Sequence, residues 1–255
     1  MVDQVSRDTQ AKDAGFGAYA APRQRCEPNL LLATSMFLIF LVPNIILPLV
    51  FGIVLYGATF GNNGLSGYAG AIWGAAAAYA LTLWAVYLNF RSDEGVILHS
   101  VGWRWPAHRL QAWLPMLAVF FGLIILGGSL YEQHLGQSLQ QEITDLIRTI
   151  INSDWYPTAG VTLLLVCVLG PLVEELVFRG YLQSALNRHL PSWMAISLSS
   201  LVFAAIHFDL PALPVLLLAG VCLGTLYQLT RSLLPPVILH MAVNTYGVVN
   251  VSPSF

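Results

Sequence analysis

The stretch VTLLLVCVLGPLVEELVFRG, residues 161–180, reads as a membrane-spanning helix that carries two adjacent carboxylates, Glu174 and Glu175. A carboxylate near the centre of a bilayer costs on the order of 2.5–3.5 kcal/mol even on mild insertion scales. Two neighbouring carboxylates in one span are therefore unusual. Because ionisable side chains inside a membrane commonly mark functional sites, we expect this pair to take part in the function of the protein.

Composition predicts that the whole chain belongs in a membrane. It has 255 residues, of which 56% are hydrophobic and 9% are charged, whereas soluble domains carry about 25% charged residues. The sequence contains no basic stripe that would follow nucleic-acid phosphates, so no nucleic-acid partner is expected. Its three cysteines are scattered and predict no disulfide framework. The partner that composition does predict is the lipid bilayer.

Seven apolar segments approach the roughly 20 residues that a membrane span needs. They are residues 30–56, 67–90, 113–131, 157–179, 192–208, 211–229 and 233–250. The predicted fold is therefore all-α: one polytopic membrane helix bundle of about seven transmembrane helices, within residues 30–255. Residues 1–29 are polar and predict a disordered tail. Pro43 and Pro48 predict a kink or a break in the first span.

Basic residues separate onto one side of the membrane if the N-terminus is cytoplasmic. Of the eleven Lys and Arg residues, only Arg148 then falls on the other side. The positive-inside rule thus predicts a multi-pass integral membrane protein with a cytoplasmic N-terminus and its C-terminus outside. Two connections are predicted to lie on the membrane surface, an amphipathic helix in 132–155 and an aromatic anchor in 91–112. The tryptophans of this anchor are Trp103, Trp105 and Trp113.

Helical spacing gives the two glutamates different roles. Glu175 and Arg179 are four residues apart, with the acid before the base, and are predicted to form an ion pair on one helix face. Glu174 is rotated by about 100° from Glu175 on a regular α-helix and stays free of that pair. The fourth and fifth spans form a hairpin whose turn centres on 190–191. Equal rise along its two arms predicts that Glu174 lies opposite His207.

The last span adds His240 and Asn244, which lie one turn apart on a single face of its helix. Three helices are therefore expected to bring one Glu, two His and one Asn together. Taken singly, a buried His is more often a hydrogen-bonded core residue, and an Asn in a membrane helix more often joins two helices. The prediction of a functional site consequently depends on the whole set.

Three motifs in this half of the chain are EELVFRG from Glu174, FAAIH from Phe203 and HMAVN from His240. They resemble the motifs of the CAAX prenyl protease and bacteriocin-processing family of intramembrane endopeptidases, in which EExxxR, FxxxH and HxxxN follow one another on three helices. The resemblance covers about residues 157–247, the expected motif core. The first three spans carry no such signature.

The resemblance implies hydrolysis of a peptide bond in a membrane-associated peptide or protein. Glu174 would activate the attacking water with help from His207, and donors aimed at the developing oxyanion would come from His240 and Asn244. The residues that would shape the site are Glu175, Arg179 and Phe203.

The resemblance leaves the need for a metal open. Glu174, His207 and His240 would form a His₂Glu set of the kind that several zinc hydrolases use, so a divalent metal, zinc first, is the expected cofactor. The sequence lacks the H-E-x-x-H motif that delivers two ligands and a base from one helix. A metal-free glutamate mechanism is therefore the alternative.

Two other functions compete with proteolysis. A non-proteolytic immunity or scaffold protein of the same family would be favoured by the loss of a motif residue, and none is lost. A proton or cation transporter would be favoured by an internal repeat or by a second, symmetry-related polar site. Neither is visible in the sequence.

Overall fold

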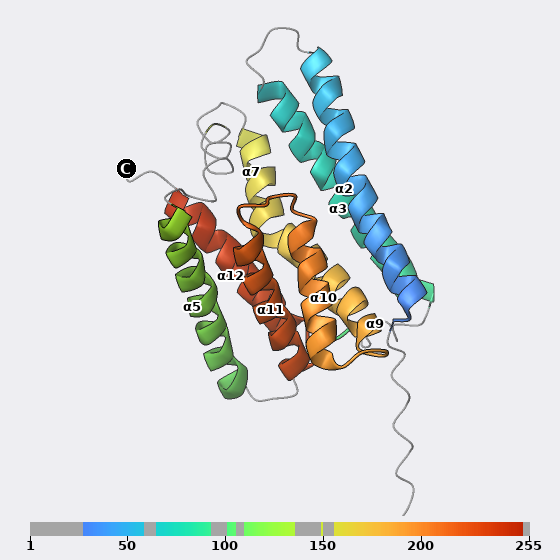
Figure 1. The fold of residues 1–255 in the computed structure, drawn as a ribbon. Coiled ribbons are helices and arrows are strands. Elements are labelled where there is room, and N and C mark those ends of the chain that lie inside the picture. Colours follow the sequence, from blue (N-terminus) through green and yellow to red (C-terminus); the bar gives the residue numbers. More distant parts are fainter. Residues whose placement is uncertain are drawn as a thin grey trace, which may run out of the picture.

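A computed structural model describes residues 28–58, 65–92, 101–105, 110–135, 149 and 156–251, and these form seven helical segments (Figure 1). The first three are α2 (Leu30–Ala58), α3 (Leu65–Ser92) and α5 (Leu110–Leu135). The fourth is one irregular helix that comprises α7 (Tyr156–Leu164), η2 (Leu165–Leu169), α8 (Gly170–Glu175), η3 (Leu176–Gln183) and α9 (Ser184–Leu186). The last three are α10 (Ser192–Ala205), α11 (Leu213–Thr230) and α12 (Leu234–Val251).

This architecture confirms the predicted all-α membrane bundle. Five helices in the described part of the chain are long and apolar enough to cross a membrane, namely Leu30–Leu55, Gly67–Arg91, Ala112–Leu135, Tyr156–Leu186 and Leu213–Thr230. α10 is apolar but shorter, so the predicted span 192–208 ends before His207. The predicted tail 1–29 and the surface helix in 132–155 lie largely outside the described residues.

Successive helices alternate in direction, so their connections gather at the two ends of the bundle (Figure 1). Arg91, at the end of α3, Arg188, after α9, and Arg231, after α11, share one end. Arg104 joins this group, because its Nε donates a hydrogen bond to the carbonyl oxygen of Arg231 over 2.9 Å. The grouping agrees with the distribution on which the positive-inside argument depends. Which side of a membrane this end faces stays a prediction.

α2 runs through both of its prolines. Of the predicted kink or break at Pro43 and Pro48, the break is not formed, because the helix is continuous from Leu30 to Ala58. Between the two prolines, Asn44 Nδ2 donates to the carbonyl oxygen of Phe40 over 2.8 Å.

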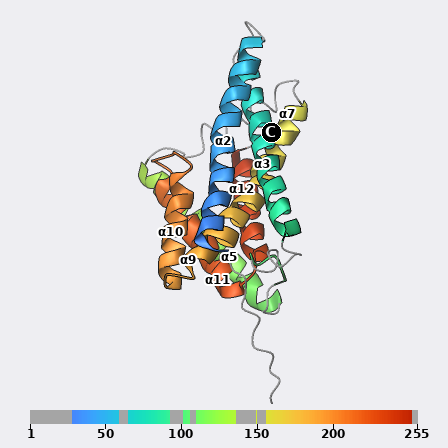
Figure 2. The ribbon, with the colours of Figure 1, turned by 90° about the vertical axis from the view of Figure 1, so that its right-hand side faces the viewer.

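Glycines bring α2 and α3 into close contact along an antiparallel hairpin, whose far end extends beyond the other helices (Figures 1 and 2). A Cβ on Gly70 would lie 2.3 Å from the carbonyl oxygen of Phe51, and one on Gly74 would lie 2.4 Å from that of Leu47. Only a residue without a side chain fits at these distances. The small residues of the second span thus do what their composition predicts, which is to let two backbones approach.

The helix Tyr156–Leu186 occupies the centre of the bundle. Half of its most apolar window is buried inside the protein, against 6% for α2. Segments of this helix contact α2, α3, α10, α11 and α12. Phe178 packs edge-to-face with Phe37, Phe40 and Phe203, from two neighbouring helices. Side chains on this helix are therefore within reach of every helix that supplies a motif.

The predicted aromatic anchor in 91–112 is described only in part. Trp103 and Trp105 are exposed, as an anchor at a membrane surface requires. Trp113 is buried at the start of α5, so its assignment to the anchor is wrong. Its apolar ring is covered by the protein itself rather than presented to lipid headgroups.

Gly74→Val is expected to separate α2 from α3, because the new side chain would collide with the backbone of Leu47. Overpacking of this kind costs roughly 1–3 kcal/mol or more, which a lowered Tm of the purified protein in detergent would report. Gly122→Val is the matched control, since an added Cβ on Gly122 in α5 meets no atom within 4 Å. Equal Tm values for the two variants would contradict this packing.

Candidate active site

The central helix is irregular on both sides of its two glutamates. The short α-helical piece α8, which ends at Glu175, lies between the π-helical segments η2 and η3. A π-helix makes i→i+5 hydrogen bonds, so it turns later side chains away from their α-helical directions. Single π-helical turns are common at functional sites. The irregularity therefore coincides with the residues that the sequence singled out.

Glu175 and Arg179 form the predicted ion pair. Arg179 Nη1 donates to Glu175 Oε1 over 3.1 Å, and both side chains are completely buried. The second guanidinium nitrogen, Nη2, donates to the carbonyl oxygen of Gly220 on α11 over 3.0 Å. The same guanidinium lies over the ring of Phe203, 4.8 Å from its centroid. A charge that would be costly in the bilayer is thus paired and hydrogen-bonded inside the protein.

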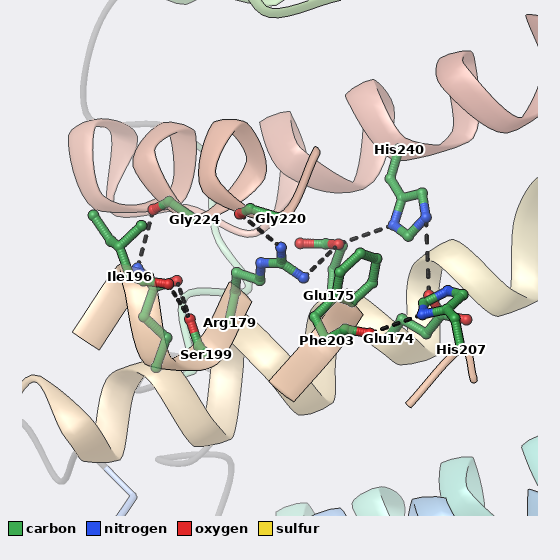
Figure 3. Close-up of polar contacts among 11 residues, drawn as sticks. Glu174, Glu175, Arg179, Ile196, Ser199, Phe203, His207, Gly220, Gly224 and His240 are labelled. Atoms are coloured by element: carbon green, nitrogen blue, oxygen red, sulfur yellow. Dashed lines mark hydrogen bonds and ion pairs between the residues drawn. The ribbon is translucent and has the colours of Figure 1, made fainter. Parts of the chain in front are cut away.

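His240 also binds Glu175. Its Nδ1 lies 2.9 Å from Oε1, the same oxygen that Arg179 contacts (Figure 3). A carboxylate held by an arginine is an acceptor only, so the proton of this hydrogen bond belongs to His240 Nδ1. The other ring nitrogen, Nε2, is left facing Glu174 Oε2 at 3.9 Å. Glu175 therefore fixes both the tautomer and the orientation of His240.

Glu174 has partners other than the predicted one. Its Oε2 faces His240, while its Oε1 accepts a hydrogen bond of 3.3 Å from the hydroxyl of Tyr79 on α3. Its side chain keeps 14% of its surface exposed, whereas that of Glu175 keeps none. The helical phase argument is thus confirmed in its main result. Glu175 is held in the buried ion pair, and Glu174 is left out of it.

The predicted pairing of Glu174 with His207 is not formed as a contact. His207 lies at the same end of the polar cluster as Glu174 in Figure 3, but no hydrogen bond or ion pair joins the two. The prediction assumed two regular arms of equal rise. Instead α10 ends at Ala205, so His207 lies in the turn beyond the helix, and η3 makes the other arm irregular. His207 is consequently exposed at the edge of the cluster.

The tautomer of His207 is set by the backbone. Its Nδ1 lies 2.7 Å from the carbonyl oxygen of Phe203. A carbonyl oxygen only accepts, so Nδ1 carries the proton and Nε2 is the nitrogen open to a ligand or substrate. The ring of Phe203 contacts both histidines, with centroid separations of 4.9 Å to His207 and 5.8 Å to His240. Phe203 thus separates and orients the two imidazoles, in keeping with its predicted shaping role.

Asn244 fastens the last helix to η2. Its Nδ2 donates to the carbonyl oxygen of Val166 over 2.9 Å. In the i→i+5 pattern this carbonyl would be paired with residue 171, which is Pro171 and has no N–H. The neighbouring donor, the N–H of Gly170, is already bound to the carbonyl of Leu165. Asn244 therefore satisfies a carbonyl that the helix leaves open, and its other amide N–H remains available.

Sequence reasoning missed the residues that bring α11 against the central helix. Gln183 Nε2 donates to the carbonyl oxygen of Gly224 over 3.0 Å, one turn along from the contact between Arg179 and Gly220. A Cβ on Gly220 would lie 2.9 Å from Ser200 Cβ, and one on Gly224 would lie 2.8 Å from Gln183 Oε1. The signal was present in the sequence, because Gly-x-x-x-Gly in a membrane helix favours close packing.

The expected metal ligands are only partly assembled. Both histidines use Nδ1 for a hydrogen bond and keep Nε2 open, as metal-bound histidines commonly do. Glu174 Oε2 and His240 Nε2 lie 3.9 Å apart. Yet no group of three His, Cys, Asp or Glu side chains within the described ranges is gathered closely enough to hold an ion. The arrangement with His207 as third ligand is therefore not formed.

Comparison with known proteins gives the same family as the motifs. Residues 156–246 match the family model described as "Type II CAAX prenyl endopeptidase Rce1-like". Over 90 residues, 33% of this chain, the sequence is 39% identical to the "Membrane-embedded CAAX protease MroQ" of Staphylococcus aureus. Over 124 residues, 49% of this chain, it is 26% identical to the "Putative membrane peptidase YdiL" of Bacillus subtilis. No solved structure matches significantly.

A third relative is similar over a longer stretch. The chain is 28% identical over 176 residues, 66% of its length, to an "Uncharacterized 24.3 kDa protein" of Escherichia coli, of which 74% is covered. The matches span 36% of MroQ and 49% of YdiL, so the chain aligns with about a third to a half of the first two relatives. The segment matched by the family model contains all three motifs. Residues 156–246 are therefore similar to type II CAAX prenyl endopeptidases, in agreement with the family that the three motifs resemble.

Proposed function

We propose that the protein is an intramembrane endopeptidase that hydrolyses a peptide bond of a membrane-associated peptide or protein. The observation that carries this proposal is the Glu174 carboxylate facing His240 Nε2 at 3.9 Å inside a helix that is long and apolar enough to cross a membrane. The match to a CAAX endopeptidase family model and the names of two relatives support the same activity.

The attacking water would lie between Glu174 and His240. A separation of 3.9 Å is too long for a direct hydrogen bond, and a polar contact of this length suits a bridging water. Glu174 would take a proton from this water as the oxygen attacks the carbonyl carbon of the substrate. The carbonyl oxygen then becomes the oxyanion of a tetrahedral intermediate.

Donors for that oxyanion are available on α12. The second amide N–H of Asn244 is not used by the Val166 carbonyl. His240 Nε2 would donate in the doubly protonated form of the ring, in which both ring nitrogens are donors. Removing one such donor typically costs about 10²–10³ in kcat. We propose that these two residues bind the oxyanion together.

Collapse of the intermediate breaks the carbon–nitrogen bond and requires a proton on the leaving amine. Glu174 holds the proton taken from water and would deliver it to that nitrogen. His207 is exposed at the edge of the cluster with Nε2 open, so it would assist this transfer from the substrate side. The products are a carboxylic acid and an amine, which leave as a carboxylate and an ammonium once the acid has passed its proton to the amine, and Glu174 is again ionised.

The depth of the site favours a substrate that is itself embedded in or associated with the membrane. Glu174 lies near the middle of the 31-residue helix Tyr156–Leu186. A peptide bond reaches this depth only if its chain enters the apolar part of the bundle, which a membrane-embedded or lipid-associated segment does at low cost. A freely soluble peptide would have to give up the hydrogen bonds that its backbone N–H and C=O groups make to water.

Replacing Glu174 by Gln is expected to lower kcat by roughly 10²–10⁴-fold, because an amide does not take the proton from water. The assay would follow cleavage of a membrane-anchored peptide library by the full chain in liposomes. Glu132→Gln, in α5, is the matched control and should keep wild-type activity. Wild-type rates from Glu174→Gln would refute this mechanism. No cleavage by the wild-type protein would favour the non-proteolytic alternative.

We keep the divalent metal as a separate proposal, with Glu174, His207 and His240 as its ligands. If the reaction uses such an ion, a chelator is expected to abolish cleavage and added Zn²⁺ to restore it, since a catalytic zinc needs three protein ligands and an open position. The proton-transfer steps above use no metal. Full activity in excess chelator, together with no bound metal by elemental analysis, would reject the metal.

A further inference from the structure

We propose that Tyr79, on α3, is a positioning residue of this site, which holds the carboxylate of Glu174 in the orientation that directs one oxygen to His240. The catalytic meaning of this inference rests on the proposed function. Its structural basis does not, because the contact between Tyr79 and Glu174 is part of the fold. α3 also lies outside residues 156–246, so the family match assigns no role to it.

The two oxygens of Glu174 have different partners. Tyr79 Oη donates to Oε1 over 3.3 Å, and Oε2 faces His240 Nε2 at 3.9 Å. Among the described residues, Glu174 is the only hydrogen-bond partner of the Tyr79 hydroxyl. The two oxygens of a carboxylate are equivalent, so a half turn about its terminal torsion restores the same arrangement, whereas any smaller turn would lose the hydroxyl as donor. The hydrogen bond therefore fixes the plane of the carboxylate, with one oxygen at Tyr79 and the other facing His240.

The surrounding structure leaves room for this contact. A Cβ on Gly170 would lie 3.4 Å from Tyr79 Oη, 3.8 Å from Glu174 Oε1 and 2.7 Å from the carbonyl oxygen of Leu165. The absence of a side chain at Gly170 thus keeps the space beside the hydroxyl open. The ring of Tyr79 packs against Phe40 of α2 at a centroid separation of 6.2 Å. The phenol is consequently held by this ring contact and by its hydrogen bond to Glu174.

The hydrogen bond from Tyr79 orients the carboxylate of Glu174 effectively because its surroundings are apolar. A carboxylate with few donors in a low-dielectric bundle has several orientations of similar energy, and only one directs Oε2 to the proposed water. A hydrogen bond to a charged group is worth more there than in water and removes that freedom. The α2–α3 hairpin, which carries no family motif, thereby becomes part of the site.

The test uses Tyr79→Phe, which removes the hydroxyl and keeps the ring. Tyr87→Phe is the matched control on the same helix, where the side chain is 55% exposed. Tyr79→Phe is expected to lower kcat about ten-fold and to leave KM unchanged within about two-fold, as for loss of one hydrogen bond to a charged group. Tyr87→Phe should leave both constants unchanged.

Infrared difference spectra of the full chain in nanodiscs give a readout that does not depend on cleavage. Tyr79→Phe should shift one carboxyl stretching band, and the same substitution in a Glu174→Gln background should shift none. An unchanged band, or an equal fall in kcat for Tyr87→Phe, would overturn the role of Tyr79. A shifted band in a protein that cleaves nothing would support the contact and refute the protease proposal, so the two failures are distinguishable.

Discussion

One oxygen of Glu175 accepts two hydrogen bonds inside the bundle, from Arg179 Nη1 at 3.1 Å and from His240 Nδ1 at 2.9 Å. Glu175 and Arg179 have no exposed surface, so neither charge is compensated by solvent. Breaking a buried ion pair by removing one partner typically costs about 3–5 kcal/mol. The position of α12 relative to the central helix, and with it the direction of His240 Nε2, therefore depends on this pair.

Close helix packing is the second condition for the site. Arg179 and Gln183 on the central helix donate to the carbonyl oxygens of Gly220 and Gly224 on α11. A Cβ on Gly220 would lie 2.9 Å from Ser200 Cβ, and one on Gly224 would lie 2.8 Å from Gln183 Oε1, so larger residues would displace α11 and its carbonyl acceptors. The π-helical segments add the local changes of direction that a regular helix would not provide. Packing and irregularity together place two adjacent glutamates in different surroundings.

The parts of the site that depend on local spacing were predictable from the sequence. The ion pair between Glu175 and Arg179 follows from their i,i+4 spacing, because both residues lie on the same helix. The contact of Glu174 with His207 failed because it required regular geometry across a whole hairpin, and α10 ends before His207. Tyr79 carried no signal at all, because its contact with Glu174 depends on how α3 packs in three dimensions.

The fold, like the site, was predictable from local sequence pattern but not where it depends on three-dimensional contacts. Hydrophobic segment length predicted most helices within a few residues, since the bilayer sets that length. The fourth helix is the exception, because it continues beyond the predicted end at 179 to Leu186. The small residues of the second span predicted close packing, which Gly70 and Gly74 provide. Sequence pattern did not predict the π-helical turns, although η2 ends just before Pro171, which lacks the N–H that the carbonyl of Val166 would need.

The central claim is that Glu175 holds the structure and Glu174 reacts. Comparing the free energies of unfolding of Glu174→Gln and Glu175→Gln with that of the wild type tests it most directly. The account predicts that Glu175→Gln destabilises the protein by about 3–5 kcal/mol, because Arg179 loses its buried counter-charge. Glu174→Gln should stay within about 1 kcal/mol of the wild type, because its carboxylate makes a single hydrogen bond to the residues that the structure describes. Equal losses of stability, or a larger loss for Glu174→Gln, would contradict the account.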